Sequence, residues 1–138
     1  MDSLNQRNYM SQWVKIAGTI LFEKFEISSI DAREDVIVSG YVSTLCSDDR
    51  KTQDECTVPY GSEGKLEHFI MPESGVVVFY GALRDKGDEI VDEMQEYLAR
   101  ISKDQMISQG IFEIVIGGEK KVIFQYEQSD EKWKIIYC

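Results

Sequence analysis

The sequence has a single histidine, three cysteines and two prolines among its 138 residues. The scarcity of histidine excludes most hydrolase triads and zinc sites, because both usually draw on it. No eighteen apolar residues run together, so we expect no membrane-spanning helix. Basic residues are also few, since 15 lysines and arginines against 25 acids give a net charge of -10. This balance argues against nucleic acid and anionic membranes as partners, because both require clustered bases.

The small number of cysteines and the absence of a signal-peptide pattern in the first residues indicate the cellular compartment that we expect. Cys46 and Cys56 flank a polar segment, and Cys138 is the last residue. A disulfide between Cys46 and Cys56 is sterically conceivable, but three cysteines without a signal peptide favour reduced thiols. The sequence has no CxxC pair that would strengthen a metal site. We therefore expect a cytoplasmic protein with no metal and no other cofactor.

The length and the apolar content suit a single folding unit. Domains usually run about 100 to 200 residues, and a chain of this size buries roughly two thirds of its unfolded surface. Hydrophobic residues make up 43% of the chain. We therefore expect residues 1–138 to form one domain with its own core.

The first half of the chain predicts a helix, a strand and a long loop. Residues 8–27 have apolar side chains at three- and four-residue steps, which favours a helix. A strand is the competing interpretation, because apolar residues also alternate there and Gly18 weakens a helix by about 1 kcal/mol. Residues 35–45 are rich in β-branched side chains and predict a strand. Residues 46–66 are polar and predict an exposed loop.

The second half gives clearer patterns. Residues 68–72 can begin a strand, and the apolar run of residues 76–83 predicts a central strand covered on both faces. Asp88 can cap a helix with an apolar stripe and an acidic opposite face, and Gly110 is a plausible stop after it. The stripe consists of Ile90, Val91, Met94, Tyr97, Leu98 and Ile101.

Three alternating runs then end the chain, at residues 111–116, 122–126 and 133–137. Gly117 and Gly118 supply the positive φ angles of a tight hairpin between the first two. The sequence thus predicts an α+β fold. In this fold an N-terminal helix and a second amphipathic helix pack on a mostly antiparallel sheet of about five strands, with a C-terminal β-meander.

No pattern of residues indicates catalysis. A Cys56–His68 dyad is formally available, but no glycine-rich nucleophile turn and no orienting group accompany it. The glycines form no phosphate-binding motif, and the segment around Asp48 and Asp49 does not have the ligand spacing of an EF-hand. We therefore expect no catalytic residues.

The acids are concentrated in two stretches. Six lie between Asp48 and Glu67 and seven between Asp85 and Asp104, which is over half of the 25. They are either a solvated loop and helix face or a docking surface for a cationic protein, with an aromatic anchor supplying affinity. The partner-binding candidates are Asp48, Asp49, Asp54, Glu55 and Tyr60 in the loop, and Asp88, Asp92, Glu93 and Glu96 on the helix.

Three stretches resemble a known family. They are the strand Val77–Tyr80, the acidic helix Asp88–Arg100, and the hairpin Gly118–Tyr126 followed by Asp130. Their order and composition resemble the YezG-like immunity proteins, which neutralise toxins in bacterial competition. The resemblance runs mainly over residues 76–130. It implies a cytoplasmic inhibitor that binds a toxin domain stoichiometrically and catalyses nothing.

The leading hypothesis is thus a small acidic inhibitor, a monomer or weak dimer, that occludes a basic toxin domain such as a nuclease. A second hypothesis is an acidic secretion chaperone or adaptor, which would dimerise and hold an apolar segment against an exposed hydrophobic strip. A third is a domain that binds a small molecule in a pocket between helix and sheet.

Overall fold

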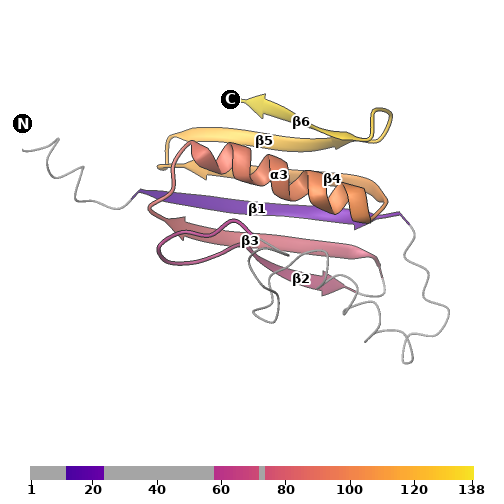
Figure 1. The fold of residues 1–138 in the computed structure, drawn as a ribbon, viewed down its shortest axis with the longest axis horizontal. Helices are drawn as coiled ribbons and strands as arrows, with labels where there is room; N and C mark the ends of the chain where they lie inside the picture. The colour runs from indigo at the N-terminus through magenta and orange to yellow at the C-terminus, as the bar shows by residue number, and fades with distance from the viewer. Residues whose placement is uncertain (1–11, 24–57, 72–73) are drawn as a thin grey trace, which may run out of the picture.

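The computed structural model describes residues 12–23, 58–71 and 74–138. Within these residues one helix packs on a six-stranded antiparallel sheet (Figure 1). The elements are β1 (Trp13–Phe22), β2 (Glu67–Met71), β3 (Val76–Arg84), α3 (Glu89–Asp104), β4 (Ile107–Ile116), β5 (Lys120–Glu127) and β6 (Lys132–Tyr137). No helix in this part of the chain has the length and apolar character needed to span a membrane.

The strands follow the order β2-β3-β1-β4-β5-β6, so the first strand in the chain lies in the middle of the sheet. β1 pairs antiparallel with both β3 and β4, which are therefore parallel to each other. α3 is the connection between them, and Figure 1 shows it in front of the sheet along β1 and β4. The helix thus covers the centre of one sheet face.

The core lies between α3 and this face. α3 buries Ile90, Met94, Leu98 and Ile101 completely, at the three- and four-residue spacing of one helical stripe. Every second residue of the strands points toward α3 and packs against this stripe, because side chains alternate between the two faces of a strand. The buried strand residues include Val14, Ile16, Ile20, Val77, Phe79, Ile114 and Phe124.

Phe112 on β4 is the centre of an aromatic cluster under the helix. Its ring centroid lies 5.0 Å from that of Phe79 and 5.7 Å from that of Trp133. The Trp133 indole N–H donates to Ser102 Oγ at 2.8 Å, and this hydroxyl donates to the Leu98 carbonyl. β6 is thereby fastened to α3 as well as to its neighbouring strand.

The helix at residues 89–104 and the C-terminal meander confirm the sequence prediction. Phe112 faces Phe124 across the β4–β5 pair, and Tyr126 faces Trp133 across the β5–β6 pair, as the alternation requires. Gly117 and Gly118 have φ angles of 62° and 74° in the β4–β5 turn. Asp88 occupies the N-cap position of α3, but its side chain makes no capping hydrogen bond.

The predicted N-terminal helix and the count of about five strands are wrong. Residues 13–22 form the central strand β1, and six strands are present with one helix in the described residues. The alternation of Val14, Ile16, Ile20 and Phe22 determines this outcome, because each of these side chains enters the core. The components are still a helix and an antiparallel sheet, so the overall class is similar to the predicted α+β class.

Gly110 also has a role other than the predicted helix stop. α3 ends at Asp104 and Gly110 lies inside β4. A Cβ atom at this position would lie 2.3 Å from Cη2 of Trp133, so glycine is needed there for close packing of the indole. The predicted strand at residues 35–45, most of the predicted loop at 46–66 and the Cys46–Cys56 disulfide lie outside the described residues.

The second face of the sheet carries exposed apolar side chains. β3 was predicted to be covered on both faces, but it lies next to the edge strand β2 and its Tyr80 is 50% exposed. The same face carries Phe69 of β2, which is 61% exposed, and Ile111 of β4, which is 49% exposed. The helix therefore shields one side of the sheet only.

Candidate partner-binding site

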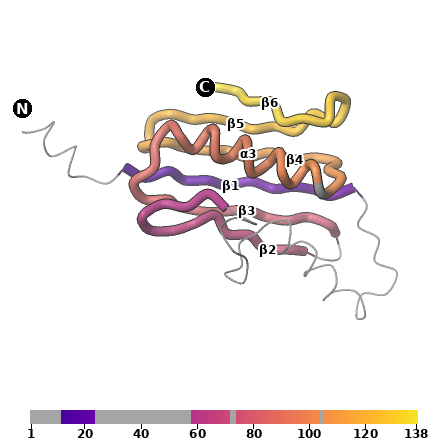
Figure 2. The backbone as a smooth tube through the Cα atoms, in the orientation of Figure 1, coloured from indigo at the N-terminus to yellow at the C-terminus, as the bar shows by residue number. Residues whose placement is uncertain are grey.

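A small hairpin at residues 60–65 forms one wall of the candidate site. Tyr60 and Lys65 form an isolated antiparallel bridge, and the Gly61 N–H donates to the Gly64 carbonyl at 2.9 Å. Buried Val58 and Leu66 anchor the hairpin on either side. Figure 2 shows this magenta segment lying beside β3.

The hairpin is fixed to the end of β3 by hydrogen bonds. The Ser62 N–H donates to the Arg84 carbonyl at 2.9 Å, and the Arg84 N–H donates to the Glu63 carbonyl at 3.0 Å. The Ser62 hydroxyl donates to Asp85 Oδ2 at 2.5 Å, and the Arg84 guanidinium lies 2.6 Å from Glu63 Oε1. These contacts fix the hairpin that carries Tyr60, whose side chain is 48% exposed.

A pocket of about 560 Å³ lies between this hairpin and α3. Its volume is within the range of about 300–1,000 Å³ that is usual for binding pockets. The lining mixes acidic, basic and phenolic groups. It consists of Val58, Pro59, Tyr60, Gly61, Ser62, Asp85, Lys86, Glu93, Glu96, Tyr97 and Arg100.

Lys86 connects the two walls of the pocket. Its Nζ lies 2.8 Å from Glu93 Oε2 on α3 and 5.5 Å from the centroid of the Tyr60 ring. The Lys86 side chain is only 16% exposed, so the cation is largely withdrawn from water. An ammonium group is thus held between a carboxylate and the face of an aromatic ring, which attracts cations through its quadrupole.

The floor of the pocket contains a buried phenol. Tyr97 is 2% exposed, and the Arg100 guanidinium lies 5.3 Å from its ring centroid. Burial raises the pKa of the Tyr97 phenol well above its usual value of 10.0, and the positive charge of Arg100 only partly opposes this rise. Tyr97 therefore stays neutral at physiological pH.

The structure brings three of the nine predicted residues together, because Tyr60, Glu93 and Glu96 all line this pocket. Glu96 is exposed, and it has no ion pair within the described residues. Asp92 is exposed on α3 and does not line the pocket. Asp48, Asp49, Asp54 and Glu55 lie outside the described residues.

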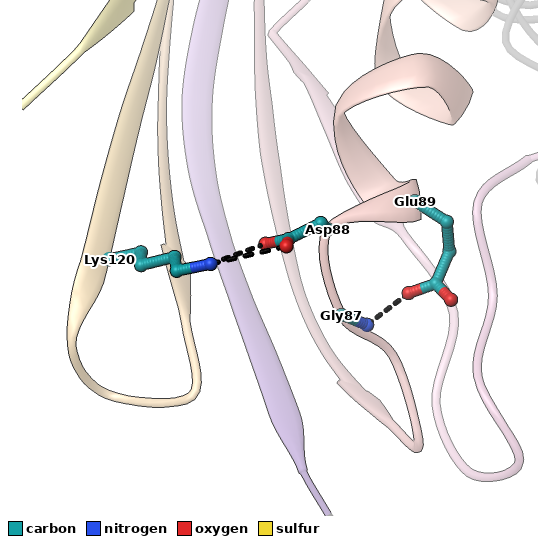
Figure 3. Close-up of polar contacts among 4 residues, drawn as sticks. All are labelled: Gly87, Asp88, Glu89 and Lys120. Carbon is teal, nitrogen blue, oxygen red and sulfur yellow. Dashed lines mark hydrogen bonds and ion pairs between the residues drawn. The ribbon is translucent and has the colours of Figure 1, made fainter.

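Asp88 has a different environment at the start of α3. Its two carboxylate oxygens accept from Lys120 Nζ at 3.1 and 3.2 Å, which links the helix to the β4–β5 hairpin (Figure 3). Beside it, the Gly87 N–H donates to Glu89 Oε1. The acidic helix thus lines a pocket with its middle and carries an exposed ion pair at its start.

Four residues that line the pocket were not among the predicted ones, namely Asp85, Lys86, Tyr97 and Arg100. Glu96 and Arg100 are four residues apart, which places them on one side of α3, so the sequence could have predicted Arg100 next to Glu96. No local signal connects Lys86 to Tyr60, because their contact depends on how the hairpin docks on β3.

His68 lies on β2 with its ring centroid 6.3 Å from that of Phe79, outside the pocket. Cys56, its hypothetical dyad partner, is outside the described residues. In the part of the chain that the structure describes, no group of three or more His, Cys, Asp or Glu side chains could hold a metal ion.

We expect His68 to make the fold less stable in mild acid. Burial lowers the His68 pKa below its ordinary value of 6.5, so the unfolded chain takes up a proton before the folded chain does. The free energy of unfolding should therefore fall as the pH drops below about 6.5. Urea unfolding at several pH values should show a smaller fall in His68→Gln than in the wild type. Equal pH dependence in both would contradict this role.

Comparisons of the chain with protein families, with curated proteins and with solved structures gave no match.

Proposed function

We propose that this chain is a small acidic inhibitor that binds a basic protein stoichiometrically, most simply an immunity protein for a toxin domain such as a nuclease. The proposal involves no catalysis and no cofactor. The binding site would be the pocket between the 60–65 hairpin and α3, together with the exposed acidic side chains of the helix. The cytoplasm is the compartment in which such an inhibitor would act.

The observation that carries the proposal is the position of Lys86 inside the pocket. The site already accommodates one ammonium group, on the Tyr60 ring and against Glu93. Glu96 lines the same pocket with a second, exposed carboxylate. A lysine or arginine of a partner would meet a carboxylate at Glu96, as Lys86 does at Glu93.

Two further considerations support a toxin as the partner. Nuclease surfaces must attract phosphate, so an acidic protein can imitate the charge of the substrate and associate rapidly. The resemblance to YezG-like immunity proteins covers β3, α3 and the β4–β5 hairpin, and α3 provides the acidic wall of the pocket.

The experiment is a titration of the purified chain with basic toxin domains, beginning with any that a neighbouring gene encodes. We expect a one-to-one complex by calorimetry and loss of the toxin's activity at equimolar inhibitor. Absence of binding would refute the immunity hypothesis. Binding without loss of activity would refute inhibition and leave only the protein-binding function.

A secretion chaperone or adaptor is the second candidate, because an exposed apolar strip is what that hypothesis requires. Phe69, Tyr80 and Ile111 provide such a strip on the sheet face away from α3. Under this candidate an unfolded apolar peptide would bind the chain, and binding would depend on Phe69 rather than on Glu96. A peptide titration of Phe69→Lys and Glu96→Lys variants separates the two candidates.

A further inference from the structure

The sheet face opposite α3 is more apolar than a solvent-facing sheet should be. In antiparallel sheets with one wet face, the outward positions are normally polar. On β3, however, the outward side chains that precede the terminal Arg84 are Val76, Val78, Tyr80 and Ala82, and all four are in register with outward positions on β1. The strand has the composition of one that is covered on both sides.

The cross-strand register joins these side chains into one continuous patch. Phe69 pairs with Val78, Val78 with Thr19, and Thr19 with Ile111, which forms a row across four strands. The neighbouring row pairs Met71 with Val76 and Val76 with Leu21. Exposure is 61% for Phe69, 41% for Met71 and 49% for Ile111. Soluble monomers rarely expose apolar patches larger than a few hundred Å².

We propose that this face binds a second copy of the chain, so that two sheets pack face to face with the α3 helices on the outside. The area is adequate for such a dimer. Six strands spaced about 4.8 Å apart, with up to ten residues each at about 3.4 Å, give a face of roughly 800 Å². A standard stable interface buries about 800 Å² per partner.

Charge favours a second copy on this face rather than the basic partner of the pocket. Glu89, Asp92, Glu93 and Glu96 of α3 lie on the helix side of the sheet, which makes that side repulsive between copies. The outward strand positions instead carry nearly balanced charge. They hold Lys15, Lys121, Lys132 and Lys134 against Glu67, Glu113 and Glu127, and the remaining outward charge, Arg84, is paired with Glu63.

Two copies with a net charge of -10 each therefore repel least when these faces meet. The same balance gives a cationic partner no reason to dock here. The dimer also leaves both pockets at its outer surfaces, so it does not depend on the proposed inhibitory function. The dimer does cover the apolar strip that the adaptor hypothesis requires, so this strip would not be free to bind another segment.

The test is the mass of the full chain in solution by sedimentation velocity at micromolar concentrations. We expect twice the chain mass for the wild type. Phe69→Lys and Ile111→Lys should each weaken the dimer by about 30-fold or more, because a large apolar side chain of the proposed interface is replaced by a charge. Both positions are exposed, so both variants should keep the wild-type circular dichroism spectrum.

Tyr137→Lys is the matched control, because Tyr137 is 70% exposed and pairs with buried Val122, which faces α3. It should leave the dimer unchanged. A wild-type monomer would overturn the proposal and leave the face to residues 24–57 or to another protein. A dimer that resists both Phe69→Lys and Ile111→Lys would overturn it equally, because the two copies would then meet elsewhere.

Discussion

Phe112→Ala is expected to lower the free energy of unfolding by about 3–5 kcal/mol. Phe112 is completely buried in the middle of β4, between Phe79 and Trp133. Its truncation removes apolar contacts and leaves a cavity that the paired strands on both sides cannot close. Urea unfolding followed by tryptophan fluorescence measures the change, since Trp133 itself lies in the cluster.

Gln125→Ala is the control for this substitution. Gln125 is exposed on the neighbouring strand β5, next to the partner of Phe112 but on the opposite sheet face. Its replacement should change stability by about 0.5 kcal/mol or less. A loss below about 1 kcal/mol for Phe112→Ala would mean that β4 is not packed under α3 as described.

The second large effect concerns the pocket. Glu96→Lys is expected to weaken binding of the basic domain by about 10- to 100-fold, because it places a cation where the partner's cation binds. Tyr60→Ala should weaken it by at least about 5-fold through loss of an aromatic anchor. Glu93 is less suitable for substitution, because its removal would leave the largely buried Lys86 without its carboxylate. Surface plasmon resonance gives both the affinities and the association rates.

Asp130→Lys makes the same change of charge at a distant place. Asp130 is exposed in the turn between β5 and β6, whereas the hairpin with Tyr60 is attached to β3 near the other edge of the sheet. This control should alter the affinity by about 3-fold or less, which screening allows over such a distance. Equal losses in Asp130→Lys and Glu96→Lys would show that only net charge matters and that the pocket has no special role.

Sequence patterns predicted α3 and the β4–β5–β6 meander because local periodicity and short turns determine them. They failed at residues 13–22, where apolar residues fit both a helical and an alternating pattern. Pairing with β3 on one side and β4 on the other decides in favour of a strand. Gly18 is part of that outcome, since a Cβ atom there would lie 2.4 Å from Cδ2 of Phe112.

The candidate site was predictable in part. Tyr60, Glu93 and Glu96 could be selected from exposure, charge and helix position. The position of the Lys86 ammonium group among them could not be predicted, because Lys86 reaches Tyr60 only when the 60–65 hairpin is hydrogen-bonded to Arg84. The contact of Asp88 with Lys120 was not predictable from a local pattern either, because Lys120 lies on another element, and Asp88 remains exposed in that ion pair.

The central claim is that Glu96, in the pocket between the 60–65 hairpin and α3, receives a cation from a basic partner. The most direct test is the Kd of the wild-type chain for the basic domain at about 0.1 M and about 1 M ionic strength, where the Debye length shortens from about 10 Å to about 3 Å. We expect the Kd to rise at least about 10-fold between these conditions for the wild type, and clearly less for Glu96→Lys. A Kd that is the same at both ionic strengths would contradict the claim.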